Sequence, residues 1–130
     1  MKSNTDKLRK EIVSLISTTG STALSSRVYY LNFPKPATYP YVVYDLRETQ
    51  TLDGRTSFTL ELDCVDHAAA PKTVNALADA IQDALDHCVV NTTDLFFHCY
   101  RSRRYPVTED DKEIRRIHLQ MELYYYTKEE

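Results

Sequence analysis

Four histidines and three cysteines are the side chains in this sequence best suited to metal or nucleophilic chemistry. His98 and His118 fall on the two strands predicted nearest the C-terminus. A connection centred near Thr108 would place them opposite each other on one face of a sheet. Two histidines leave a tetrahedral zinc site unfinished. We therefore expect them to be polar-face or interface residues, and we expect no bound metal.

The cysteines are odd in number and far apart in sequence. Cys64, Cys88 and Cys99 form no CxxC pair, and each sits among apolar residues. A structural zinc module needs closely spaced pairs of ligands. The pattern therefore predicts buried free thiols, which behave as small apolar side chains.

Catalytic constellations are likewise incomplete. Glu61 and Asp63 point the same way from one predicted strand, but no further feature supports acid–base work, and a solvated sheet face explains them. Gly20 and Gly54 are the only glycines, which excludes a phosphate-binding loop, a dinucleotide fingerprint and a glycine-flanked serine nucleophile. We expect a protein that is not an enzyme and takes no cofactor.

A mixed-charge segment surrounds the predicted loop from Arg103 to Glu113. Its basic residues are Arg101, Arg103, Arg104, Lys112, Arg115 and Arg116, and its acidic ones are Glu109, Asp110, Asp111 and Glu113. Two interpretations stay open: a docking surface for an acidic partner or passing DNA, and a solvated loop. The loop geometry assumed for the histidines would set Arg101 opposite Arg115, which is unfavourable unless a partner supplies anions.

Residue periodicity predicts the elements that position these side chains. The expected helices are Thr5–Thr18 and Lys72–His87, and the expected strands are Arg27–Leu31, Tyr41–Glu48, Ser57–Asp66, Leu95–Ser102 and Ile114–Thr127. Pro34, Pro36 and Pro40 predict an extended loop, Asp53-Gly54 a hairpin turn, and Val89–Asp94 a short turn.

Side-chain alternation assigns the faces of the strands. In the strand 57–66, Phe58, Leu60, Leu62 and Cys64 share an apolar face, while Glu61 and Asp63 point away. The apolar stripe of the second helix contains Val74, Leu77, Ala78, Ile81, Leu85 and Cys88. We therefore predict one α+β domain spanning residues 1–130, an antiparallel or mixed sheet with two main helices packed on one face.

Composition bounds the class of protein. The net charge of −3 argues against a dedicated nucleic-acid binder, which normally has a basic domain. No apolar run approaches the roughly 20 residues of a membrane helix, and the N-terminus lacks a secretory signal. The expected site of synthesis is the cytoplasm, with no membrane partner.

Several segments together resemble one protein family. They are Arg27-Val28-Tyr29, the prolines followed by Tyr39-Pro40-Tyr41-Val42-Val43, the Asp53-Gly54 turn before the strand ending Leu62-Asp63-Cys64-Val65-Asp66, and the alanine-rich helix from Val74 to Leu85. This pattern resembles the tail terminators, or tail-to-head joining proteins, of long-tailed phages. The resemblance implies an α+β structural subunit without catalytic residues. It implies a ring, usually of six copies, at the interface of tail and head in the virion, assembled in the host cytoplasm.

A ring subunit needs complementary surfaces for its neighbours and a further one for the tail tube protein or the head connector. We expect these contacts from Arg47, Glu48, Asp53, Arg55, Arg101, Arg103, Arg104, Glu109, Asp110, Asp111 and Lys112. Glu61, Asp63 and Glu122, on the face away from the helices, are expected to line the channel, where acidic walls keep passing DNA from sticking. The free subunit is expected to be a monomer.

Two alternatives remain. A head-completion protein of the neck has a similar size and role. A nucleic-acid-binding module would instead stack bases on aromatic side chains of the open sheet face. Its platform would be Phe96, His98, Tyr100, His118 and Tyr124. Glu61, Asp63 and Glu122 argue against it if they share that face.

Overall fold

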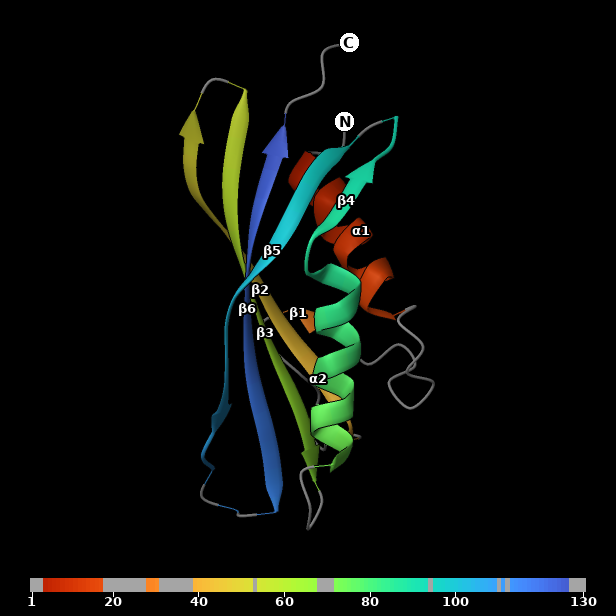
Figure 1. The fold of residues 1–130 in the computed structure, drawn as a ribbon, viewed down its shortest axis with the longest axis vertical. Coiled ribbons are helices and arrows are strands. Elements are labelled where there is room, and N and C mark those ends of the chain that lie inside the picture. Colours follow the sequence, from red (N-terminus) through yellow and green to blue (C-terminus); the bar gives the residue numbers. More distant parts are fainter. Residues whose placement is uncertain are drawn as a thin grey trace.

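The computed structural model describes residues 4–17, 28–30, 39–52, 54–67, 72–93, 95–109, 111 and 113–126. This part of the chain forms two helices and six strands (Figure 1). In chain order they are α1 (Asn4–Ser17), β1 (Val28–Tyr30), β2 (Tyr41–Leu52), β3 (Arg55–His67), α2 (Lys72–Leu85), β4 (Cys88–Asn91), β5 (Phe96–Val107) and β6 (Ile114–Tyr126).

All six strands belong to one sheet, in the order β1-β2-β3-β6-β5-β4. β1 pairs with β2 in parallel, and every other pairing is antiparallel. The sheet is therefore mixed, and the predicted α+β class is confirmed. β3 and β6, each 13 residues long, form its centre although 46 residues separate the end of one from the start of the other.

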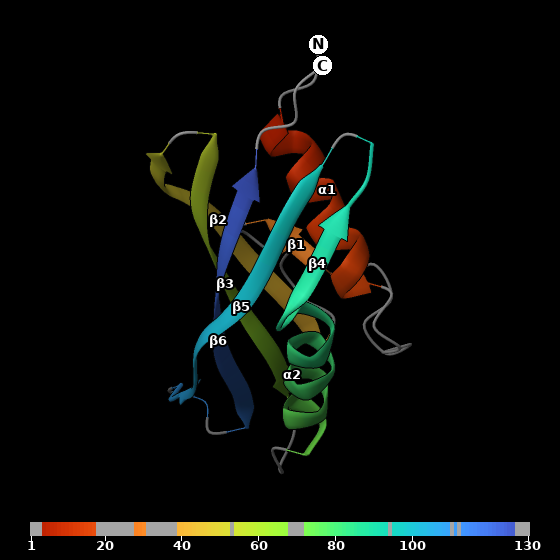
Figure 2. The same cartoon turned by 45° about the horizontal axis from the view of Figure 1, so that its top comes forward.

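Both helices cover the same face of the sheet (Figures 1 and 2). In α1, Leu8, Ile12 and Ile16 are buried at helical spacing. The buried side chains of α2 are Val74, Leu77, Ala78, Ile81 and Leu85. Alternate residues of the strands complete this core, including Leu60, Leu62, Phe97, Leu119, Met121 and Leu123. The predicted apolar faces of the strand 57–66 and of α2 are confirmed, except that Cys88 lies beyond the end of α2.

The β2–β3 hairpin is longer than the sequence predicts. Pairing continues to Leu52 opposite Arg55, with a bulge at Thr49 between Glu48 and Gln50. Gly54 has φ = 74°, a left-handed conformation that glycine adopts without a steric penalty. The hairpin tip lies at the end of the molecule opposite the β5–β6 connection (Figure 1).

The predicted loop from Arg103 to Glu113 is wrong over its first half, because β5 continues to Val107. Pro106 suggested a strand end, since proline cannot donate to a sheet ladder. β4, however, pairs only with Phe96–Cys99, so the rest of β5 has an edge without a described partner strand. Proline is tolerated there, opposite Ile117 of β6.

The segment after α2 also differs from the prediction. α2 ends at Leu85, and His87 adopts φ = 62° at the change of direction. Cys88 therefore leaves the helical stripe and opens β4, where a short turn was predicted for Val89–Asp94. β4 is only four residues long, which makes its signal weak in the sequence.

Some predictions fall outside the described residues. These concern the loop with Pro34 and Pro36, the chain ends, and the proposed contact residues Asp53, Asp110 and Lys112. Neither described helix is long and apolar enough to cross a membrane.

Candidate functional site

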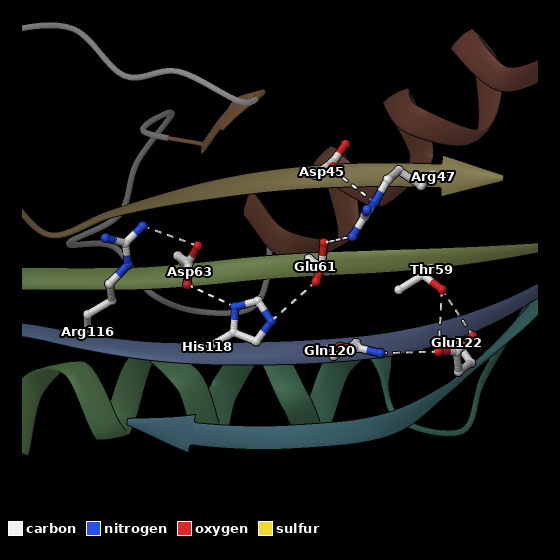
Figure 3. Close-up of polar contacts among 9 residues, drawn as sticks. All are labelled: Asp45, Arg47, Thr59, Glu61, Asp63, Arg116, His118, Gln120 and Glu122. Carbon is white, nitrogen blue, oxygen red and sulfur yellow. Dashed lines mark hydrogen bonds and ion pairs between the residues drawn. The ribbon is translucent and has the colours of Figure 1, made fainter. Parts of the chain in front are cut away.

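The face of the sheet without helices carries a charged cluster made of Asp45, Arg47, Glu61, Asp63, Arg116 and His118 (Figure 3). These residues come from β2, β3 and β6, and the register between these strands makes them neighbours. Asp45 pairs with Glu61, Glu61 with Gln120, and Asp63 with His118. Alternation predicts that such residues share a face, but it is the pairing of β3 with both β2 and β6 that makes them neighbours.

His118 lies between two carboxylates of β3 (Figure 3). Its Nδ1 is 3.0 Å from Oδ1 of Asp63, and its Nε2 is 3.6 Å from Oε1 of Glu61. The His118 side chain is only 13% exposed, so solvent screens these contacts less than it would at the surface. The Tyr105 ring covers the imidazole at 5.0 Å between centroids. These contacts with Asp63, Glu61 and Tyr105 fix the orientation of the imidazole.

Two arginines pair with the carboxylates of this cluster. Arg116 donates to Glu109 at 2.7 Å and to Asp63 at 3.3 Å. Burial would lower the pKa of Arg116, but hydrogen bonds to these two carboxylates outweigh it and raise that pKa. Arg47 pairs with Asp45 at 3.2 Å and also with Glu61. Every carboxylate of the charged cluster thus has a cationic partner.

Glu122 continues the polar face along β6. Its carboxylate accepts a long hydrogen bond from Thr59, at 3.3 Å to Oε2, and one from Gln120 at 3.5 Å (Figure 3). Glu61, Asp63 and Glu122 therefore all lie on the open face, as the alternation predicts. Whether they line a channel stays a prediction.

An aromatic cluster occupies the same face at the other end of β5 and β6. It comprises Phe96, His98, Tyr100, Tyr124 and Tyr126, with ring centroids of contacting pairs 5.2 to 6.2 Å apart. The Arg55 guanidinium lies 4.8 Å from the Tyr124 centroid, a cation–π contact. His98 Nε2 is 2.9 Å from the Tyr126 hydroxyl, while its buried Nδ1 has no hydrogen-bond partner among the described atoms.

The predicted pairing of His98 with His118 is wrong. His98 lies opposite Tyr124, and His118 lies opposite Tyr105. The connection is centred nearer residue 111 than Thr108, and a bulge between Arg101 and Arg103 shifts the register further. The two histidines share a face but belong to different clusters.

The predicted opposition of Arg101 and Arg115 is wrong for the same reason. Arg101 lies opposite Met121 of β6, and Arg115 lies opposite Asp66 of β3. Asp66 is an acid, so the like-charge repulsion that would splay the hairpin does not arise at this position.

Two of the predicted contact arginines bind α2 or the turn after it within the same chain. Arg104 donates to Asp79 at 2.7 Å and to Gln82 at 3.0 Å. The backbone N–H of Arg101 donates to Asp86 at 2.8 Å, and its guanidinium to Gln82 at 3.4 Å. These bonds fasten β5 to the helix, which gives both arginines a role within the fold.

The other predicted contact residues lie nearer the two ends of the sheet. Arg47, Glu48 and Arg55 belong to the β2–β3 hairpin. Glu109 and Asp111 lie in the β5–β6 connection, where Asp111 is 3.3 Å from His67. Glu48 and Arg103 are exposed and have no ion pair among the described residues. Among the predicted contact residues that the structure describes, these two are therefore available to another molecule.

A groove of about 430 Å³ lies beside this connection, between the start of α2, the end of β5 and the start of β6. Its lining includes Val74, Pro106, Ile117, Glu109 and Arg116. Within the described part of the chain, no group of three or more His, Cys, Asp or Glu residues is arranged to hold a metal ion.

The fold has counterparts among solved structures. A chain in the structure of the virion of a native gene transfer agent particle is similar over 95% of this chain and 91% of its own length, with 21% identity and a TM-score of 0.61. A second solved protein, named only by a sequence identifier, is similar over 97% of this chain and 98% of its own length, with 15% identity and a TM-score of 0.73. Neither a family model nor a curated protein sequence matches this chain. At these identities the likeness concerns the fold.

Proposed function

We propose that this protein is the ring subunit of a phage-type tail terminator, which stops growth of the tail tube and joins the tail to the head connector. The observation that carries the proposal is the near full-length likeness to a chain from a gene transfer agent virion. The sequence resemblance to tail terminators supports it independently. The role is structural, takes no cofactor and belongs to the tail–head interface of the virion.

The open face suits the wall of a channel that DNA must pass. Its acidic side chains, Glu61 and Asp63, repel phosphate, and they are held by His118, Arg47 and Arg116 within the same face. A wall with fixed, internally paired charge offers DNA few free cations to bind. DNA therefore passes without sequence-specific binding.

Different parts of the sheet supply different surfaces, as heterologous ring contacts require. One proposed contact surface is the β2–β3 hairpin with Glu48, and the other is the edge of β5 with Arg103. Opposite charges at these positions suit contact between successive copies. The β5–β6 connection, with Glu109 and Asp111, is left to meet the tube protein or the head-completion protein.

The proposal is tested by adding the purified chain to its cognate tail tube protein during polymerisation. Electron microscopy is expected to show tubes that stop growing and carry a ring, usually of six copies, at one end. A serum-albumin control at the same concentration should leave tube growth unchanged. Continued growth with no density at either tube end contradicts the proposed function.

A nucleic-acid-binding module is the second candidate, because the aromatic cluster offers contiguous rings on an open face. The same face carries the carboxylates of Glu61, Asp63 and Glu122, which oppose phosphate. A fluorescence titration with single-stranded DNA at several salt concentrations separates the two functions. Binding that weakens steeply with salt favours the module, and no binding at low salt favours the ring subunit.

A further inference from the structure

The pairing of β4 with β5 brings together two cysteines that the sequence leaves apart. Cys88 and Cys99 are direct cross-strand partners in the antiparallel register. Both side chains lie on the helix-covered side, where Cys99 is buried and Cys88 is partly buried against the core. Both are free thiols.

The backbone geometry of such a pair suits a disulfide. Directly opposed residues of antiparallel strands have Cα atoms about 4.5 to 5.5 Å apart. Disulfides span Cα separations of about 4.4 to 6.8 Å. The two cysteines can therefore be joined without moving either strand far.

The two thiols also differ in reactivity. A hydrogen bond from Cys99 lowers the pKa of Cys88, against the opposing effect of burial. That hydrogen bond, together with burial, raises the pKa of Cys99. Cys88 is thus the thiol that ionises first and meets an oxidant, since it is also the more exposed of the two. Burial raises the pKa of Cys64 to about 12, which leaves that thiol inert.

We propose that Cys88 and Cys99 are a redox modification site, which forms an intramolecular disulfide when the protein meets a peroxide. The Cys88 thiolate attacks hydrogen peroxide, the O–O bond breaks, and Cys88 sulfenic acid and hydroxide form. The Cys99 sulfur then attacks the Cys88 sulfur, and the hydroxyl leaves as water. Overall, two thiols lose two electrons and two protons to one peroxide, and two waters are produced.

The disulfide clamps the edge of the sheet. β4 has four residues and pairs with only the first part of β5, so few backbone hydrogen bonds hold it. The His87 N–H to Cys99 carbonyl bond, at 2.8 Å, lies directly beside the new link. The cross-link prevents β4 from separating from β5 and closes a short loop in the unfolded chain, which stabilises the fold. This inference does not depend on the ring function.

The test treats the reduced full-length protein with hydrogen peroxide, alkylates the remaining thiols and maps the peptides by mass spectrometry. A Cys88–Cys99 cross-link with Cys64 alkylated is the expected result, and Cys64 serves as an internal control for thiol burial. The oxidised protein should melt about 5–10 °C higher than the reduced protein. Amide exchange in Val89 and Val90 should slow.

A Cys88→Ser variant is the matched control, because serine keeps the size of a partly buried side chain and removes the attacking sulfur. Its melting temperature should not rise with peroxide. Three free thiols in the treated wild-type protein, a cross-link that uses Cys64, or cross-links only between molecules would each overturn the proposal. The wild-type peptide map decides the matter even if the variant folds poorly.

Discussion

The two faces of the sheet are built from the same strands but are specified differently. On β6, Ile117, Leu119, Met121, Leu123 and Tyr125 are buried under the helices, while the residues between them lie on the open face. The covered face needs only apolar side chains of suitable size. The open face instead carries particular ion pairs and ring contacts that a core does not require. The difference indicates that burial of the covered face determines the fold, and we propose that the open face serves recognition.

The largest expected effect is a loss of stability that differs between the two faces of β5. Phe97 is fully buried, whereas its neighbour Phe96 packs on Tyr126 of the open face. Phe97→Ala should lower the free energy of unfolding by about 3–5 kcal/mol through the cavity it leaves. Phe96→Ala should cost about 1 kcal/mol. Urea unfolding of both variants measures this, and equal losses would contradict the division between the faces.

The next effect concerns the charged cluster. His118 and Asp63 are partly desolvated and 3.0 Å apart, so their interaction should contribute about 1 kcal/mol to stability. A double-mutant cycle with His118→Ala and Asp63→Asn isolates that coupling. Thr59 and Glu122, whose hydrogen bonds are 3.3 and 3.4 Å, form the control pair with weaker coupling. A coupling near zero for His118 and Asp63 would mean that the cluster is only loosely held.

A third prediction separates recognition from stability. Glu48→Lys and Arg103→Glu reverse exposed charges, so each should change the unfolding free energy by less than about 0.5 kcal/mol. Each should still reduce binding to tube ends, because successive copies would then carry like charges at the contact that we propose. Arg104→Glu is the control, since it breaks the bond to Asp79 within the subunit and should lower stability. Unchanged end binding in both variants would exclude these residues from the ring contact.

The smallest effect is a pH dependence. The backbone N–H of Glu113 and the side chain of His67 lower the pKa of Asp111 from its usual 3.8. A carboxylate with a lowered folded-state pKa contributes stability above its unfolded pKa, and this is lost as pH falls through the folded value. Asp111→Asn should therefore flatten the acid side of the stability profile slightly below about pH 4. Thermal melts of the wild-type protein and the variant between pH 2 and 6 test this, and their melting temperatures should differ on the order of tenths of a degree. A melting temperature that falls more steeply with decreasing pH in the variant would contradict the assignment.

The sequence predicted the covered face well, because alternation in β3 and β6 and the helical stripe of α2 are local patterns. Phe58, Leu60, Leu62 and Cys64 all lie where the alternation places them. The same pattern placed Glu61 and Asp63 on the open face. These predictions succeed since burial follows the period of each element.

The register across strands could not be predicted in the same way. The position of His98 opposite Tyr124 depends on a bulge and on the length of the β5–β6 connection. The contact of His118 with Asp63 depends on β6 pairing with β3, which are distant in sequence. Pro106 led to a wrongly predicted loop, because proline interrupts a central strand but is tolerated in a strand at the edge of a sheet. Cys88 was assigned to a helix, so its pairing with Cys99 was missed.

The most direct test of the ring proposal is a cryo-electron microscopy reconstruction of the protein bound to the end of its tail tube. We predict a closed ring in which Glu61, Asp63 and Glu122 face the central channel and the helices lie outside. A ring with those carboxylates on its outer wall would contradict the assignment of the open face. A chain that forms no ring on the tube would contradict the function itself.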